Sequence, residues 1–321
     1  MTNSSGDATR RNGSHRDEPA FSPGDVVAAR YRIVSLIGSG GCSDVYEALD
    51  GALGVTVALK TLRPQLARSA VQLERFRREI QNARKVTHPN VCRIFDMGVH
   101  SAQGRDRFFL TMELLPGRSL AQRLESGPAY DVVQALPVVA QIVDGLQAAH
   151  DAGVVHRDLK PGNIMLLPPP SGKVADRAVI TDFGIAISDE QGDLRLTQTG
   201  DVVGTPEYMA PEQADLGPPL PASDIYALGL IIYEMLTRQL PFDRADTPMA
   251  TILKRRKEPP RPLHQDLPTT SPVWEATVLR CLEREPADRF PRAADVVLAL
   301  RGEIPASRRK TGRFRRKNPR D

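Results

Sequence analysis

Residues 156–163 read HRDLKPGN, and after one intervening loop residues 182–184 read DFG. These two stretches contain a proton acceptor, Asp158, and two side chains with hard oxygen ligands, Asn163 and Asp182. A nucleoside triphosphate needs Mg²⁺ to hold its charge, and Mg²⁺ prefers oxygen ligands of this kind. The combination predicts phosphoryl transfer, in which Asp158 accepts the proton of an attacking hydroxyl.

The composition is that of an ordinary globular protein. The chain has 321 residues, of which 40% are hydrophobic and 26% charged, enough for two lobes with separate cores. Three dispersed cysteines fit neither a disulfide framework nor a C-x-x-C metal site, so a reducing cytoplasm is the expected location. The first residues lack the apolar stretch of a signal peptide. The longest apolar run, residues 226–233, is far shorter than the roughly 18 to 20 residues that span a bilayer.

The net charge of +4 comes from one end of the chain. Eight of the 43 basic residues and only one of the 39 acidic residues lie in residues 304–321, so the remainder has a net charge of −3. We expect a basic tail that contacts anionic surfaces weakly through residues 308–320. In a longer receptor-type protein, the same stretch would lie beside a membrane span. A nucleic-acid-binding protein is the rival interpretation, but the tail has one aromatic residue, Phe314, and no folded platform for stacking.

Periodicity predicts an N-terminal sheet followed by a helical region. The predicted strands lie at residues 31–37, 45–49, 55–60, 91–95 and 108–112, with a polar loop at 100–107 and a helix at 69–85. Beyond residue 116, helices are predicted at 131–150, 223–236, 274–282 and 293–300. Residues 168–173 read as a surface loop between two strands.

A glycine-rich stretch follows the first predicted strand. Residues 38–45 have the pattern G-x-G-x-x-S-x-V, in which Ser43 replaces the usual third glycine; alone, this pattern also fits an ordinary hairpin. Residues 57–60, VALK, follow on the third predicted strand. Together with HRDLKPGN and DFG, these stretches resemble the protein kinase superfamily, and in particular the bacterial eukaryotic-like serine/threonine kinases.

This resemblance implies an α+β, bilobal protein kinase fold. A small antiparallel β-sheet N-lobe with one main helix is expected at residues 29–114, and a larger, mainly helical C-lobe at 115–303. A disordered polar arm at 1–28 and a disordered basic tail at 304–321 would flank this domain.

The resemblance also implies a binding site for ATP with Mg²⁺ or Mn²⁺. The backbone at the glycine-rich flap would approach the phosphates. The Glu113 carbonyl and the Leu115 N–H would bind the adenine edge, with Met112 as gatekeeper. The implied nucleotide-contacting residues of the sheet and the C-lobe are Ile37, Gly38, Gly40, Ser43, Val45, Ala58, Lys60 and Met165.

Catalytic roles follow from the same resemblance. Lys60 would contact the α- and β-phosphates and pair with an acid of the helix, Glu79 in preference to Glu74, which also fits a solvated helix charge. Asp158 is the implied base, Lys160 the cation beside the transferred phosphoryl group, and Asn163 and Asp182 the metal ligands.

Further residues indicate Ser/Thr rather than Tyr specificity. The KPGN form of the catalytic loop and residues 204–208, GTPEY, are typical of Ser/Thr kinases, and Thr205 would line the substrate pocket. Glu212 is expected to form a structural ion pair with Arg289. Asp224 should hold the catalytic-loop backbone, and His156 is interpreted as a packed core histidine.

The implied activity is transfer of the γ-phosphate of ATP to Ser or Thr hydroxyls of protein substrates. Thr197 and Thr199 are the expected regulatory phosphosites, whose phosphates would meet Arg157. Autophosphorylation in trans would require transient self-association. The alternative is a pseudokinase scaffold that binds nucleotide or partners without catalysis. No sequence-specific nucleic acid partner is expected.

Overall fold

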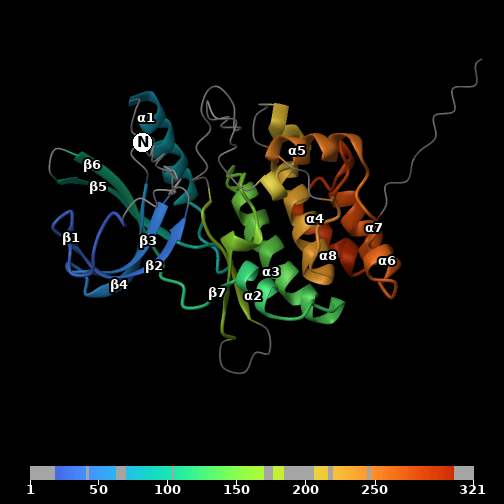
Figure 1. The fold of residues 1–321 in the computed structure, drawn as a ribbon, viewed down its shortest axis with the longest axis horizontal. Coiled ribbons are helices and arrows are strands. Elements are labelled where there is room, and N and C mark those ends of the chain that lie inside the picture. Colours follow the sequence, from blue (N-terminus) through green and yellow to red (C-terminus); the bar gives the residue numbers. More distant parts are fainter. Residues whose placement is uncertain are drawn as a thin grey trace, which may run out of the picture.

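The computed structural model describes residues 19–40, 43–62, 70–102, 105–169, 176–183, 206–215, 220–243 and 247–306. Its strands are β1 (Val26–Val27), β2 (Tyr31–Gly40), β3 (Ser43–Asp50), β4 (Val55–Thr61), β5 (Ile94–Ala102), β6 (Arg105–Met112), β7 (Arg118–Ser119), β8 (Ile164–Leu167) and β9 (Arg177–Ile180). Its α-helices are α1 (Ala70–Ala83), α2 (Leu120–Ser126), α3 (Val132–Asp151), α4 (Pro221–Thr237), α5 (Pro248–Lys257), α6 (Leu263–Asp266), α7 (Pro272–Cys281) and α8 (Ala293–Leu300). Figure 1 shows the N-lobe sheet with α1 on one side of the molecule and the helical lobe on the other.

The N-lobe is an antiparallel six-stranded sheet in the order β1-β2-β3-β4-β6-β5. The apolar face of α1 packs on it, because Phe76, Ile80 and Ala83 are all buried and share a core with Leu110 of β6. The helix predicted at 69–85 and the strands predicted at 31–37, 45–49, 55–60 and 108–112 are therefore confirmed, whereas the strand predicted at 91–95 is misplaced because β5 begins only at Ile94. The predicted polar loop at 100–107 is wrong in extent, since β5 continues to Ala102 and β6 begins at Arg105. Polar side chains on an exposed hairpin concealed its strand pattern.

The opposite face of the sheet is covered by a segment that was assigned to the disordered arm. Phe21 is 8% exposed, and its ring meets the edge of Tyr46 with ring centroids 5.8 Å apart. The Ala28 N–H donates to His100 Nδ1 at 3.0 Å, and β1 pairs with β2. The folded lobe thus begins before residue 29, and the predicted boundary is wrong for residues 19–28. Residues 1–18 lie outside the described residues.

Helices α3 and α4, both predicted from the sequence, form the centre of the C-lobe. Asp131 and Gln134 form a capping box that begins α3. The helix is long and apolar enough to cross a membrane by length and composition alone. Its residues Ile142 and Leu146 are nevertheless fully buried in the core that α3 shares with α4, so α3 is the core helix of this lobe.

The C-terminal boundary also differs from the prediction. Ile304 and Ala306 pack against the C-lobe core, and Arg280 Nη1 donates to the Pro305 carbonyl at 3.3 Å. The ordered domain therefore continues at least to residue 306, three residues into the predicted tail. The remaining tail, including residues 308–320, lies outside the described residues.

The predicted ion pair between Glu212 and Arg289 is confirmed. Arg289 Nη1 and Nη2 donate to Glu212 Oε1 and Oε2 at 2.6 and 2.8 Å, a bidentate geometry, and the Arg289 side chain is fully buried. Burial acts to raise the pKa of Glu212, but the hydrogen bonds and charge of Arg289, aided by Ser223, outweigh it and hold this pKa below 4.5. The pair joins the segment before α4 to the segment before α8.

We expect Glu212→Gln to lower the free energy of unfolding by about 3–5 kcal/mol near neutral pH, because it leaves the buried Arg289 charge unpaired. Since the folded-state pKa of Glu212 is depressed, its stabilisation is complete above the unfolded-state pKa and disappears as the pH falls through the folded-state pKa. Urea unfolding of wild type should therefore lose more stability than Glu212→Gln between about pH 5 and pH 3.

The matched control is Glu303→Gln, which removes an exposed pair with Arg301 whose closest N···O distance is 3.9 Å. This change should cost less than about 1 kcal/mol. Equal effects of the two substitutions would contradict a structural role for the buried pair.

Candidate active site

The catalytic loop, residues 156–163, is held by one buried carboxylate from α4. Asp224 is 1% exposed, and it accepts the backbone N–H groups of His156 and Arg157 at 2.8 and 2.9 Å. Asp224 Oδ2 also lies 2.8 Å from His150 Nε2 at the end of α3. The role predicted for Asp224 is thus confirmed. Arg157 has a φ of +69°, a strained conformation for a residue with a side chain, and these hydrogen bonds help to stabilise it.

The catalytic loop is tied directly to the chain that precedes the DFG stretch. The Thr181 N–H donates to the Asn163 carbonyl at 2.8 Å, and His156 Nε2 lies 2.8 Å from the Thr181 carbonyl. The His156 ring is fully buried, with its centroid 4.7 Å from that of Phe183. His156 is therefore the packed core histidine that was predicted. These contacts fix Asp182 relative to the loop.

Asp158 of this loop contacts two other predicted site residues, Lys160 and Asn163. Lys160 Nζ lies 2.7 Å from Asp158 Oδ2, and Asn163 Nδ2 donates to the Asp158 carbonyl at 2.8 Å and to Asp158 Oδ2 at 3.2 Å. Asn163 is only 6% exposed, whereas the Asp158 side chain is 39% exposed. Asp158 is thus held by two neighbours while it stays accessible to a substrate.

Lys60 on β4 reaches the DFG stretch across the two lobes. Its Nζ lies 2.8 Å from Asp182 Oδ1, and its side chain is 11% exposed. The strand register places Lys60 beside Val45 of β3 and Leu110 of β6. Asp182 has a φ of +65°, so a second non-glycine residue of the site is in the left-handed region.

The predicted ion pair between Lys60 and Glu79 is not formed in this structure. Glu79 Oε1 instead accepts from Arg157 Nη1 at 2.8 Å, and both side chains are about 15% exposed. Glu79 therefore pairs with Arg157, which was expected to meet a phosphothreonine. Asp182 pairs with Lys60, which was expected to meet Glu79. Glu74 forms an ion pair with Arg78 one turn along α1, which fits the helix charge considered for it. The sequence could not show which acid pairs with Lys60, because that pairing depends on the position of α1.

The residues predicted to enclose adenine form a single apolar cluster. Ala58, Met112, Val45, Leu115 and Met165 gather there, from both lobes and the segment that joins them. Sequence patterns missed three further buried members of the cluster, Cys92, Leu167 and Val179.

Cys92 lies behind the segment that joins the lobes. Its Sγ is 3.8 Å from the Glu113 carbonyl, and burial raises the pKa of its thiol to about 12, which keeps it protonated. The Leu115 N–H has no hydrogen-bond partner among the described residues, so it is free to donate to a ligand. No motif could have identified Cys92, because its role depends on strand packing alone.

The glycine-rich hairpin is described on both sides of its turn. Gly38 pairs with Val45, Gly40 pairs with Ser43, and Ile37 is 51% exposed outside the apolar cluster. The predicted residues Thr197, Thr199 and Thr205 lie outside the described residues. Gln213, which no motif indicated, donates to the Arg157 carbonyl at 2.9 Å and links the loop to the segment before α4.

The donor set fits a magnesium ion. Asn163 directs Nδ2 at Asp158, which leaves its Oδ1 without a hydrogen-bond partner among the described residues. Asp182 supplies a carboxylate and directly follows Thr181, whose N–H donates to the Asn163 carbonyl. Within the described part of the chain no three His, Cys, Asp or Glu residues form a metal cluster. Mg²⁺ typically uses one or two protein oxygens and completes its shell with phosphates and water, so this set is sufficient.

Comparison with known proteins agrees with this geometry. Residues 31–297 match the protein kinase domain. Because this match covers most of the chain, the protein belongs to the protein kinase family. The crystal structure of the Mycobacterium tuberculosis PknI kinase domain superposes with a TM-score of 0.68 at 25% identity, over 89% of this chain and 100% of that one.

Several relatives are bacterial serine/threonine-protein kinases. PknA of Mycobacterium tuberculosis is 39% identical over 282 residues, which are 87% of this chain and 63% of PknA. A probable serine/threonine-protein kinase of Corynebacterium efficiens is 37% identical over 279 residues, 86% of this chain and 41% of the relative. This chain thus spans between about two fifths and two thirds of these relatives' length.

We expect Asp224→Asn to loosen the catalytic loop, because an amide offers one acceptor oxygen where the carboxylate offers two. Amide hydrogen exchange, followed by NMR or mass spectrometry, should be at least about tenfold faster at His156 and Arg157, equivalent to roughly 1.4 kcal/mol of lost protection. Asp151→Asn, at the exposed end of α3, is the control and should leave exchange at both amides unchanged. Unaltered protection in Asp224→Asn would show that this carboxylate does not hold the loop.

Proposed function

We propose that this protein transfers the γ-phosphate of ATP to serine and threonine hydroxyls of protein substrates. The observation that carries the proposal is the joint position of Asp158, Lys160 and Asn163 beside the Lys60–Asp182 ion pair. The apolar cluster around Ala58 and Met112 supports adenine binding at the same cleft. The Ser/Thr assignment is further supported by the relatives, which are named serine/threonine-protein kinases.

In the proposed reaction, Asp158 orients the acceptor hydroxyl and takes its proton. The hydroxyl oxygen forms a bond to the γ-phosphorus while the bond to the bridging oxygen of ADP breaks. Lys160, whose Nζ is 2.7 Å from Asp158 Oδ2, is close enough to stabilise the negative charge of the transferred group. Catalysis by these residues is mainly positioning and charge stabilisation.

Lys60 would hold the α- and β-phosphates, and Asn163 and Asp182 would bind the metal. Mg²⁺, when bound, would neutralise part of the phosphate charge. The Leu115 N–H and the Glu113 carbonyl would bind the adenine edge. Thr205 would line the acceptor pocket. All of the groups that the chemistry requires are present in the chain, which argues against a pseudokinase scaffold.

Asp158→Asn and Lys60→Met should each reduce phosphoryl transfer to a Ser/Thr peptide by more than about a hundredfold, equivalent to roughly 2.7 kcal/mol of barrier. The assay is radiolabelled transfer from ATP with Mg²⁺, with circular dichroism to confirm the fold. Asp151→Asn and Lys257→Met, two exposed substitutions, are the matched controls and should retain activity. Near-normal transfer by either of the first two variants would refute the proposed roles.

The proposal extends to regulation by phosphorylation of Thr197 and Thr199. In this structure Arg157 forms an ion pair with Glu79, and Lys60 forms an ion pair with Asp182. A phosphothreonine adds a charge of about −1.5 to −2 and several acceptor oxygens, so it would compete strongly for Arg157. Released from Arg157, Glu79 would be able to pair with Lys60, as an active kinase requires. The protein would carry out this phosphorylation itself, in trans.

The double variant Thr197→Ala/Thr199→Ala should have lower activity toward an exogenous substrate without weaker ATP binding. Both proteins are treated with phosphatase, exposed equally to ATP, and compared for kcat and for nucleotide Kd. Thr56→Ala, an exposed threonine on β4, is the control. Full activity of the double variant would show that these phosphosites are not the switch.

A further inference from the structure

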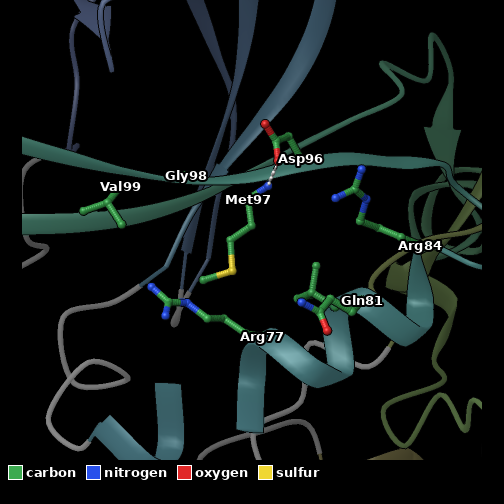
Figure 2. A pocket seen from close by; sticks show the side chains of 8 residues that line it. Arg77, Gln81, Arg84, Asp96, Met97, Gly98 and Val99 are labelled. Carbon is green, nitrogen blue, oxygen red and sulfur yellow. Dashed lines mark hydrogen bonds between the residues drawn. The ribbon is translucent and has the colours of Figure 1, made fainter. Parts of the chain in front are cut away.

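Residues 19–28, here called the N-terminal strap, lie on the face of the N-lobe sheet opposite α1. Figure 2 shows the Met97 side chain of β5 directed toward α1. Successive side chains of a strand alternate between its two faces, so His100, three residues further on, is on the opposite face. There its ring meets the edge of Phe21 at a centroid distance of 5.4 Å, and its Nδ1 accepts the Ala28 N–H at 3.0 Å. One histidine thus contacts the strap near both of its ends.

Further contacts fix the beginning of the strap. Arg107 Nη1 on β6 donates to the Ala20 carbonyl at 3.1 Å, and its guanidinium lies 5.7 Å from the centre of the Phe21 ring. The Phe21 N–H donates to the hydroxyl of Tyr46 on β3 at 3.1 Å. A segment of this kind keeps one position only where such contacts hold it. The backbone at Ala20 is therefore presented to its neighbours in a fixed place.

Asp44 joins the strap to the glycine-rich hairpin of β2 and β3. Its Oδ2 accepts the Ala20 N–H at 3.2 Å and the Tyr46 hydroxyl at 3.3 Å, whereas its Oδ1 accepts the Ser39 hydroxyl at 2.7 Å. Burial raises the pKa of the Tyr46 phenol, so this hydroxyl keeps the proton that it donates. Both oxygens of the carboxylate are used, because they face donors from different segments.

The main chain of Asp44 is tied to the strand that contains Lys60. The Asp44 N–H donates to Thr61 Oγ1 at 3.1 Å, and the same hydroxyl donates to the Asp44 carbonyl at 3.2 Å. Thr61 directly follows Lys60 on β4, and Lys60 pairs with Val45 in the strand register. Asp44 is therefore anchored through its main chain, while its half-buried side chain holds both the strap and the hairpin.

Ser39 is the hairpin residue that receives this support. It lies between Gly38 and Gly40, the glycines whose backbone we propose to approach the nucleotide phosphates. Glycine leaves the backbone with more conformational freedom than any other residue, so the hairpin has few restraints of its own. A binding segment that is already held in place loses less freedom when a ligand binds, and this raises affinity. The hydrogen bond between Ser39 and Asp44 supplies such a restraint.

We propose that Asp44 is a positioning residue for the phosphates of ATP, through which the N-terminal strap fixes the glycine-rich hairpin. The inference rests on the proposed function, because it requires this hairpin to cover the nucleotide. Asp44 acts through Ser39 and the adjacent main chain rather than by contact with the nucleotide. Loss of the link should therefore weaken binding of the phosphates but not of the nucleoside, which binds the apolar cluster around Ala58.

The test compares the affinities of the full chain for Mg·ADP and for adenosine, which lacks phosphates, by ligand-observed NMR titration. Asp44→Asn replaces one acceptor oxygen by an amide donor and should weaken Mg·ADP binding at least about fivefold. Ser39→Ala should also weaken it, and the two losses should not add in the double variant because both remove one hydrogen bond. Adenosine affinity should stay within about twofold in all three variants.

The matched control is Asp25→Asn on the strap, an exposed residue whose carboxylate accepts the Ser22 N–H at 2.8 Å within the strap itself. This change should leave both affinities unchanged. Phe21→Ala, which removes the ring that anchors the strap, should weaken Mg·ADP binding at least about threefold, and Phe21→Leu should restore most of the loss. Thermal unfolding checks that every variant is folded.

Amide hydrogen exchange at residues 38–40, measured without nucleotide, should be faster in Asp44→Asn and in Phe21→Ala than in wild type. Unchanged Mg·ADP affinity in Asp44→Asn, or equal losses of Mg·ADP and adenosine affinity, would overturn the positioning role while the proposed function stands. Failure of the wild type to bind Mg·ADP would contradict the proposed function itself and overturn this inference with it.

Discussion

The carboxylate of Asp224 lies at the point where α3, α4 and the catalytic loop meet. It accepts two consecutive backbone N–H groups and contacts His150, so one buried acid fixes the loop that contains Asp158. The left-handed conformation of Arg157 would cost on the order of 1–3 kcal/mol without such support. Because the loop also binds the chain before DFG through Asn163, the position of Asp182 depends on the same contact.

Two ion pairs connect this rigid base to the N-lobe. Lys60 pairs with Asp182, and Glu79 on α1 pairs with Arg157 on the catalytic loop. Both pairs are only partly exposed, so solvent screens them less than surface pairs. Main-chain hydrogen bonds hold the catalytic loop, whereas a side-chain ion pair joins α1 to it.

Much of the fold could be predicted because its sequence signals are local. The apolar faces of α3 and α4 and the alternation of β2 to β4 identified the elements that carry the site. The segment around Phe21 was missed because its contacts with Tyr46 and His100 are distant in sequence and show no periodicity. The ends of β5 and β6 were missed because exposed hairpin residues are polar.

In the candidate site, too, the sequence indicated some residues correctly but not all of their partners. Motif spacing indicated Asp158 and Asn163, and the structure brings them within hydrogen-bond distance. Family resemblance also indicated the structural pair of Glu212 and Arg289. The partner of Lys60 could not be inferred correctly, because the pairings of Lys60 with Asp182 and of Glu79 with Arg157 depend on how the two lobes pack.

The most direct test of the account is phosphosite mapping by mass spectrometry after incubation of wild-type and Asp158→Asn protein with ATP and Mg²⁺. The account predicts new phosphate on serine or threonine hydroxyls of the wild-type protein and of an added protein substrate, and none with Asp158→Asn. Equal phosphorylation by the two proteins, or none by either, would contradict the central claim that residues 156–163 and the DFG stretch form a phosphoryl-transfer site.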